Sequence, residues 1–166
     1  MKVAIDVYYQ ENSAKIVAAT FNQWFDPLPE KIIIKYKSPV EEYTPGAFYK
    51  RELPCLIEVL KDFNLSKIDV IVIDGYVYLN DEGKPGLGAH LYEYFKGTIP
   101  IIGVAKTSFH NNTTHVKEVY RGTSKQPLYV TAIGTDLCQA EQHIRSMDGE
   151  HRMPHILKLI DTETKR

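Results

Sequence analysis

Acidic side chains interrupt the apolar pattern of this sequence at three places, and at each place a lone charge is unfavourable. Asp6 lies inside an apolar run near the start of the chain, and Asp74 closes the apolar run Val70 to Ile73. Glu52 stands one helical turn before Leu56, so it points the same way as the apolar stripe that follows it. A carboxylate in such a position must be paired or must coordinate a cation.

A divalent-metal site explains the three acids together. If the strands that carry Asp6 and Asp74 are neighbours, their carboxylates repel each other unless a positive charge lies between them. A hard cation suits such oxygen ligands, so we expect Mg²⁺ at Asp6, Asp74 and Glu52, with Mn²⁺ able to substitute. Bound metal ions make water nucleophilic, neutralise phosphate charge and stabilise the leaving oxygen, which phosphodiester hydrolysis requires.

Lys106 is the basic residue that fits this chemistry. It follows the apolar run Ile101 to Val104, and open α/β sheets hold their sites at such strand ends. There its ammonium can contact the scissile phosphate or steady the attacking water. Ordinary explanations stay open for single residues: Asp74 in a turn, Glu52 at a helix N-terminus and Lys106 in a solvated loop. Asp6 is the hardest to explain without a partner, because it lies inside an apolar strand.

Hydrophobic periodicity predicts the elements that must position these residues. Apolar runs predict strands over residues 3–8, 14–21, 32–36, 70–73, 101–104, 116–120 and 128–132. Helical spacing predicts helices over residues 53–63, with Pro54 in the first turn, and over residues 87–95, 137–147 and 156–162. Short connections favour an antiparallel meander for the first three strands, and the later strand-helix-strand run implies a parallel pair. This order resembles the α/β ribonuclease H-like fold, which implies a mixed sheet with its first and fourth strands adjacent at the centre and helices on both faces.

Composition limits the other classes of protein. The chain has 166 residues, 43% hydrophobic and 25% charged, without internal repeat or linker, so we expect one domain over residues 1–166. A formal net charge of -1 excludes a protein that coats nucleic acid through bulk positive charge. It does not exclude an enzyme that handles phosphates through a few basic residues and metal ions.

The cysteines and the apolar runs bear on location. Cys55 and Cys138 lack the paired spacing of a zinc site, and we expect both to be buried free thiols. That favours a reducing, cytoplasmic location. No apolar run approaches the roughly 20 residues of a membrane span, so no membrane association is expected.

The chain also resembles the endonuclease V family, nucleases that act on nucleic acid containing inosine. Five parts match in order: Ala4 to Tyr9, Tyr43 to Gly46 with Phe48 to Pro54, Val72 to Gly75, Gly86 to Leu91 with Pro100 to Lys106, and Arg152 to Pro154. The resemblance implies that Asp6, Glu52 and Asp74 are metal ligands and that Lys106 is a catalytic lysine. It implies a nick in DNA or RNA one linkage beyond the inosine on its 3′ side, as in nucleic-acid repair. We expect the protein to act as a monomer.

The resemblance also implies how the substrate is held. Tyr43, Pro45 and Gly46 would form a wedge that opens the strands beside the lesion. The flipped hypoxanthine would then sit in a pocket read partly by backbone groups. Gly103 is expected to allow close approach of the nucleotide, and His90, in the matching segment before it, is assigned to substrate binding.

Two departures from the family pattern leave the level of activity open. The family has a metal-binding histidine where this chain has Thr135, with Asp136 beside it. Asp136 either serves as that ligand or caps the following helix, and capping is slightly favoured because Asp is a common cap. Second, Tyr76-Val77-Tyr78 replace the family's histidine and glycine after the second aspartate. The segment after Lys106 is also shorter than in the family, and His110 or His115 could compensate there. The alternatives are therefore an inosine-binding module with weakened catalysis, or a different metal-dependent nuclease or phosphodiesterase on the same scaffold.

Overall fold

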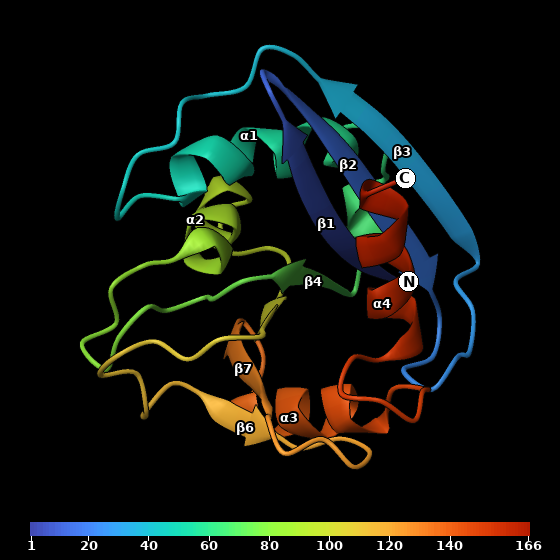
Figure 1. Cartoon of the computed structure of the whole chain (residues 1–166), viewed down its shortest axis with the longest axis vertical. Coiled ribbons are helices and arrows are strands. Elements are labelled where there is room, and N and C mark those ends of the chain that lie inside the picture. Colours follow the sequence, from blue (N-terminus) through green and yellow to red (C-terminus); the bar gives the residue numbers. More distant parts are fainter.

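The computed structural model describes all residues from 1 to 166 and contains seven strands in one mixed sheet (Figure 1). The strands are β1 (Lys2–Gln10), β2 (Ser13–Phe21), β3 (Lys31–Lys37), β4 (Val70–Asp74), β5 (Ile101–Ala105), β6 (Lys117–Val119) and β7 (Leu128–Ile133). The helices are α1 (Tyr49–Leu60), α2 (Leu87–Tyr94), α3 (Leu137–Ser146) and α4 (His155–Thr164), and a short 3-10 turn, η1, spans Leu65–Lys67.

The strand order is β3-β2-β1-β4-β5-β7-β6. β1 pairs antiparallel with β2 and parallel with β4, so the predicted adjacency of the first and fourth strands is confirmed. β4 and β5 are parallel, as the strand-helix-strand run implied, whereas β7 runs antiparallel to β5 and to β6. The C-terminal ends of β1, β4 and β5 therefore meet at one edge of the sheet.

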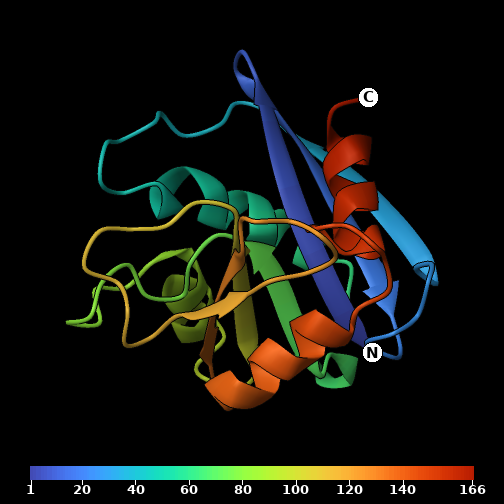
Figure 2. The same ribbon diagram turned by 60° about the horizontal axis from the view of Figure 1, so that its bottom comes forward.

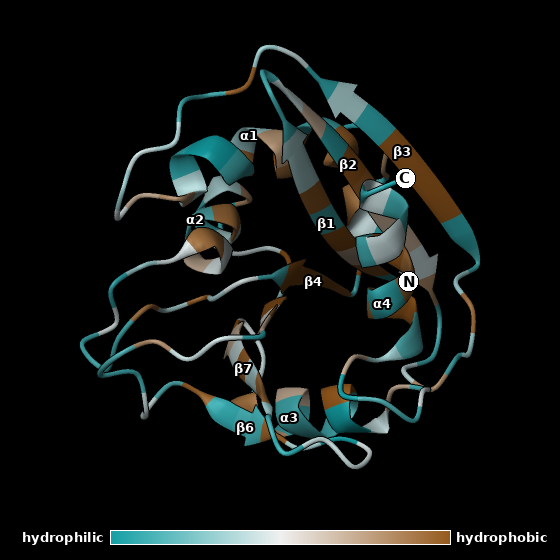
Figure 3. Ribbon diagram, in the orientation of Figure 1, coloured by the Kyte–Doolittle hydropathy of each residue, from teal (hydrophilic) through white to brown (hydrophobic).

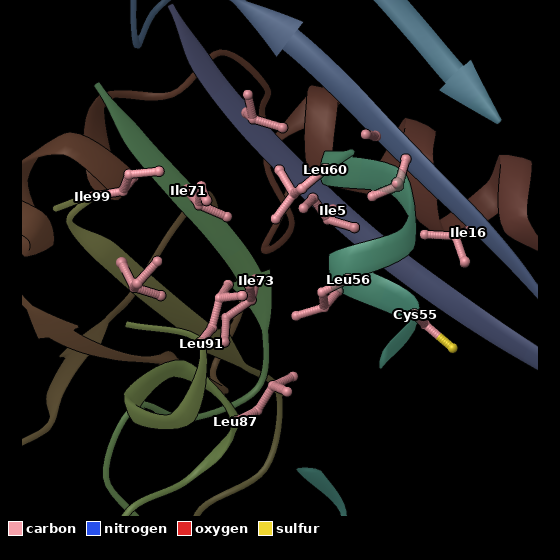
Figure 4. Packing of buried hydrophobic residues seen from close by; sticks show 14 of the residues in the cluster. Ile5, Ile16, Cys55, Leu56, Leu60, Ile71, Ile73, Leu87, Leu91 and Ile99 are labelled. Atoms are coloured by element: carbon pink, nitrogen blue, oxygen red, sulfur yellow. The ribbon is translucent and has the colours of Figure 1, made fainter. Parts of the chain in front are cut away.

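Alternation along the strands divides the core into two layers. On one face, Ile5 of β1 and Ile73 of β4 pack beneath Leu56 of α1 and Leu91 of α2 (Figure 4). On the other face, residues of the opposite parity, such as Val72, pack against α3 and α4. Helices thus cover both faces of the sheet (Figure 1, Figure 2). The apolar colour of β4 in Figure 3 reflects this arrangement, because a strand covered on both faces has no polar side.

Helix α1 differs from its prediction in where it begins. It starts at Tyr49, four residues before the predicted start, so Pro54 lies inside the helix and not in its first turn. The apolar stripe begins only at Leu53, which is why the pattern placed the start too late. Pro54 cannot bond to the carbonyl of Lys50, but Lys50 is exposed and open to water. The corrected start places Glu52 in the first turn of α1.

The two cysteines have different environments. Cys55 is buried in α1, as predicted, but Cys138 is exposed on α3, so the prediction of a second buried thiol is wrong. The buried stripe of α3 is formed by Ala140 and Ile144, and Cys138 falls outside that stripe. None of the helices is long and apolar enough to cross a membrane.

Candidate metal centre

Asp6 and Asp74 lie side by side because of the register between two parallel strands. Ile5 of β1 is aligned with Ile73 of β4, and each is followed by an aspartate. The two isoleucines pack on the α1 face, so alternation turns both carboxylates to the opposite face, beneath α4. The expectation that these two acids are neighbours is therefore met.

Lys106 joins the same face from the next strand. Asp74 is aligned with Val104 of β5, and Lys106 lies two residues further on, which preserves the side of the sheet. The Nζ of Lys106 is 3.9 Å from the Oδ2 of Asp161, which α4 contributes. Asp6, Asp74, Lys106 and Asp161 together line a narrow hollow of about 20 Å³.

Asp161 is a candidate site residue that the sequence pattern did not single out. It belongs to the buried stripe of α4 with Leu157, Ile160 and Thr164, and its own exposed fraction is 8%. Its Oδ1 lies 3.0 Å from the Nζ of Lys165. The signal that would have found it is the one that found Glu52, namely an acid within the apolar stripe of a predicted helix.

Glu52 reaches the carboxylates from the opposite face of the sheet. The first turn of α1 places its side chain at the edge of β4, where it lines a second narrow hollow together with Asp6 and Asp74. Burial raises the pKa of Glu52 to about 7, and the charge of Asp74 adds to this effect while Arg51 opposes it. The three predicted acids therefore converge at one edge, with Asp161 as a fourth.

The charges of the aspartates are poorly compensated. Burial raises the pKa of Asp6 to about 7, and repulsion from Asp74 adds to the shift. Its only hydrogen bond is donated by the backbone N–H of Val7, at 2.9 Å. Burial also raises the pKa of Asp74, against the opposing charge of Lys106. Burial opposes ionisation of Asp161 as well, but a hydrogen bond from Lys165 and the charge of Lys106 outweigh it and lower the pKa.

This donor set fits a hard divalent cation. Buried carboxylates that repel one another are stabilised in their charged form by a positive ion between them. No group of three or more His, Cys, Asp or Glu side chains in the structure is arranged so that it could hold a metal ion by itself. An open set of carboxylates is what Mg²⁺ uses when water and a substrate phosphate complete its coordination. Asp6, Glu52, Asp74 and Asp161 are the residues that would hold it.

An aromatic cavity of about 270 Å³ adjoins the carboxylates. Four aromatic side chains line it, and Glu52 and Asp74 lie at its boundary with the metal centre; the aromatic residues are Phe48, Tyr49, Tyr76 and Phe109. The rings of Tyr76 and Phe109 meet edge to face, with centroids 5.0 Å apart. A planar group held in this cavity would lie directly beside the acids.

Comparison with known proteins identifies the family. The sequence profile of the endonuclease V family matches residues 2–145. This chain belongs to the endonuclease V family. The profile match ends before α4, so Asp161 and Arg152 lie beyond the residues that it covers. A search of curated proteins by sequence finds no match.

Solved endonuclease V structures share the fold. The enzyme of Ciona intestinalis, solved with a DNA that contains an inosine, has a TM-score of 0.80 at 16% identity, over 99% of this chain and 83% of that one. The Bacillus subtilis enzyme gives 0.75 at 20% identity, over 99% and 78%. Human endonuclease V gives 0.73 at 20% identity, over 99% and 82%. The predicted ribonuclease H-like fold is thereby confirmed.

Asp136 lies outside the candidate metal centre. Ile133 at the end of β7 is aligned with Ile101 at the start of β5, because the two strands are antiparallel. Asp136 follows β7 and therefore lies at the sheet edge opposite to Lys106. Its carboxylate accepts a hydrogen bond from the backbone N–H of Gln139, at 3.0 Å, and caps α3. The predicted cap is confirmed, and Asp136 lines neither carboxylate hollow, so the structure gives no support to the alternative role as a ligand.

The histidines in the loop after Lys106 also lie outside the hollows. His115 packs against the ring of Tyr78, with centroids 5.0 Å apart, and His110 is exposed. Neither residue lines the carboxylate hollows or the aromatic cavity. Compensation by either histidine therefore has no support in the structure.

Three of the residues expected to contact the substrate, Tyr43, Pro45 and Gly46, lie near the aromatic cavity. Tyr43 is 52% exposed and packs on Phe48, with centroids 5.2 Å apart. A turn closed by a hydrogen bond from the Ala47 N–H to the Thr44 carbonyl carries Pro45 and Gly46, and Gly46, at φ 78°, lines the aromatic cavity. Tyr43, Pro45 and Gly46 therefore lie beside the aromatic cavity, and Gly46 alone of the three lines it.

Gly103 and His90 have structural explanations. A Cβ on Gly103 would lie 2.7 Å from the Oγ1 of Thr131 and would collide with the carbonyl oxygen of Gly75. Gly103 is therefore needed for strand packing, and the structure leaves no room there for a nucleotide. The ring of His90 stacks on Tyr49, with centroids 3.6 Å apart and planes at 17°, so His90 supports the cavity wall and is absent from its lining.

Arg152 is a second residue whose role only the structure shows. Its guanidinium donates hydrogen bonds to the carbonyl oxygens of Lys106 and Pro127. These bonds fix the backbone that carries the Lys106 ammonium. Arg152 begins one of the segments that resemble the family, but the sequence alone did not indicate which backbone it holds.

Proposed function

We propose that this chain is a divalent-cation-dependent endonuclease that hydrolyses a phosphodiester bond on the 3′ side of inosine or deoxyinosine. The observation that carries the proposal is the pair formed by the buried Asp6 and the solvent-accessible Asp74, flanked by Glu52 and Asp161, at the boundary of an aromatic cavity. Membership of the endonuclease V family supports the reaction class. The cation we propose is Mg²⁺, with Mn²⁺ as a substitute, and the active form is a monomer.

The protein side chains divide the work of hydrolysis. Asp6, Glu52, Asp74 and Asp161 would hold the cation, which would supply an activated water and neutralise charge on the phosphate. Lys106 faces the same hollow, where its ammonium stabilises the negative charge that develops on the phosphoryl oxygens. Arg152 keeps Lys106 in position through the backbone.

The aromatic cavity is the proposed binding site for the flipped base. Tyr49 and Tyr76 present ring surfaces, and Phe109 closes against Tyr76. Stacking on such rings stabilises an extruded base, and the nearby backbone groups can read its edge. The Ciona relative supports this assignment, because it was solved with a DNA that contains an inosine. Tyr43, beside Phe48, is the proposed wedge that separates the strands.

A nicking assay tests the proposal. Oligonucleotides of DNA and of RNA, each with one inosine, are compared with strands that carry adenosine at the same place. We expect cleavage 3′ to inosine with Mg²⁺, none with EDTA, and none of the adenosine strands. Absence of cleavage of both inosine strands at any tested divalent cation would refute the proposal. Equal cleavage of the adenosine strands would point to a different metal-dependent nuclease.

A catalytically weakened inosine-binding module is the second candidate. One observation favours it: Tyr76 replaces the histidine of the family pattern, and its hydroxyl donates to the Thr107 carbonyl rather than facing the carboxylates. Measurement of inosine binding together with turnover separates the candidates. Tight binding of the inosine strand without cleavage would support the module, and cleavage would remove it.

A further inference from the structure

A groove with a basic lining, called here the basic groove, opens at the start of α4. It has a volume of about 510 Å³ and is lined by the segment 149–153 with His155 and Lys158. Arg152 and Lys158 are positive, and two histidines add donors, whereas Glu150 is the one acid in the lining. The lining therefore carries a small excess of positive charge in a chain whose formal net charge is -1.

The groove is continuous with the metal centre. Met153 lines both the groove and the carboxylate hollow. The Nζ of Lys158 lies 3.9 Å from the Oδ2 of Asp161, so this lysine stands at the junction of the two. Asp74 in turn lines both the carboxylate hollow and the aromatic cavity. The aromatic cavity, the carboxylates and the basic groove therefore follow one another in that order.

The backbone under the groove is held in place by one buried side chain. The guanidinium of Arg121, 5% exposed, donates to the carbonyl oxygens of Met147, Gly149 and His151. Gly122 lies against the carbonyl of Glu150, where a Cβ would collide. The carbonyls of this segment are thus turned inward onto Arg121. The side chains of His151, His155 and Lys158 remain exposed above a fixed backbone.

We infer that this groove carries the sugar-phosphate backbone of the substrate strand on the 3′ side of the cut. The inference rests on the proposed function, because a cut 3′ to a base in the aromatic cavity directs the rest of the strand past the carboxylates. Lys158 and Arg152 then neutralise the charge of phosphate oxygens, and His151 donates a hydrogen bond to them. The groove lining contains no Phe, Tyr or Trp side chain, so it lacks the large rings that line the aromatic cavity. Its contacts are with the backbone and independent of sequence.

Binding of strands with different 3′ arms tests the inference. Fluorescence anisotropy is measured for labelled inosine strands that end two nucleotides after the inosine or continue for eight more. Ca²⁺ replaces Mg²⁺, and a gel confirms that the strands remain intact. We expect the full-length protein to bind the long arm more tightly, with a steeper dependence of log Kd on log salt. The double variant His151→Gln, Lys158→Gln should move the long-to-short affinity ratio towards one. It should also reduce the salt slope for the long arm by about 0.7, because one lysine-phosphate contact is lost.

Matched controls separate this groove from general charge effects. Lys31→Gln removes an exposed lysine of β3, near the opposite sheet edge, and should leave the affinity ratio unchanged. An unchanged ratio in the double variant, or a wild-type protein indifferent to arm length, would overturn the inference. The inference would also be overturned if longer 5′ arms, and not longer 3′ arms, increased the affinity and the double variant lost that increase.

The proposed function fails on a different readout. Suppose that Mg²⁺ produces no cleavage of these strands, but the affinity still depends on arm length in the wild type and not in the double variant. The role of the groove is then supported and the nuclease function is refuted. If cleavage occurs and the double variant keeps the dependence of affinity on arm length, the nuclease function is supported and the role of the groove is refuted.

Discussion

Asp6 and Asp74 occupy aligned positions at neighbouring parallel strands, and both carboxylates face α4. Burial raises the pKa of each carboxyl group, with added repulsion from Asp74 on Asp6 and from Asp161 on Asp74. Two like charges at one edge of the sheet repel each other, so without a cation this pair lowers the free energy of unfolding. This relationship is the physical basis for proposing a metal centre.

The first prediction concerns stability against pH with the cation removed. The folded pKa of Asp6 is about 7 against an ordinary value of 3.8, and that of Glu52 is about 7 against 4.5. A raised folded pKa means that the stabilising contribution is present below the ordinary value and is lost as pH rises through the folded value. In EDTA, these groups therefore lower the free energy of unfolding between about pH 4 and pH 7. Urea unfolding across this range measures it.

The Asp6→Asn variant isolates the effect from that of other titrating groups. The difference in unfolding free energy between wild type and variant should change across the same pH range, because Asn does not titrate. Mg²⁺ added at pH 8 should stabilise the wild type more than the variant, since the cation binds the charged form. A difference that is flat with pH would contradict the assignment of Asp6.

Local pattern was sufficient for much of the fold and for three of the acids. Apolar runs identified β1 and β4, and the unfavourable burial of a lone carboxylate identified Asp6 and Glu52. The direction of β7 is not a local property, and it is this direction that moves Asp136 to the far edge of the sheet. Asp161 depends on where α4 crosses the sheet, which long-range packing decides. The apolar stripe of α4 contains Asp161, but only the packing of the helix shows that Asp161 faces Lys106.

Arg152 should affect the rate more than the binding of substrate. In Arg152→Gln the backbone of Lys106 loses a donor, and a shift of the ammonium should lower kcat by roughly 10- to 100-fold. KM for a strand with a short 3′ arm should change little. Arg152→Lys, which can still donate to one carbonyl, should recover part of kcat. Equal losses in kcat and in affinity, without recovery by Lys, would contradict a positioning role.

Gly103→Ala separates packing from substrate contact. The added Cβ would collide with the Gly75 carbonyl and crowd Thr131, so the free energy of unfolding should fall by about 1–3 kcal/mol. Denaturant unfolding measures this change. The folded fraction of the Gly103→Ala variant should bind an inosine strand with the affinity of the wild type. Unchanged stability with lost affinity would restore Gly103 as a nucleotide contact.

Tyr43→Ala tests the proposed wedge. Tyr43 is half exposed beside the aromatic cavity, so its removal should slow cleavage of duplex DNA several-fold more than cleavage of the same inosine strand alone. Tyr36→Ala is the matched control, because Tyr36 is 70% exposed on the edge strand β3. Equal loss on duplex and single strand would show that Tyr43 does not separate strands.

Single-turnover cleavage of an inosine strand by Asp74→Asn and Asp136→Asn tests the metal centre most directly. Both variants exchange one acid for its amide, but Asp74 lies in the carboxylate hollow and Asp136 caps α3 at the opposite edge. Asn caps a helix about as well as Asp, so Asp136→Asn should cleave at the wild-type rate with Mg²⁺. Asp74→Asn should lose about two orders of magnitude or more, as when a charge-stabilising group is removed from a reacting centre. Wild-type cleavage by Asp74→Asn, or equal losses in both variants, would contradict the account.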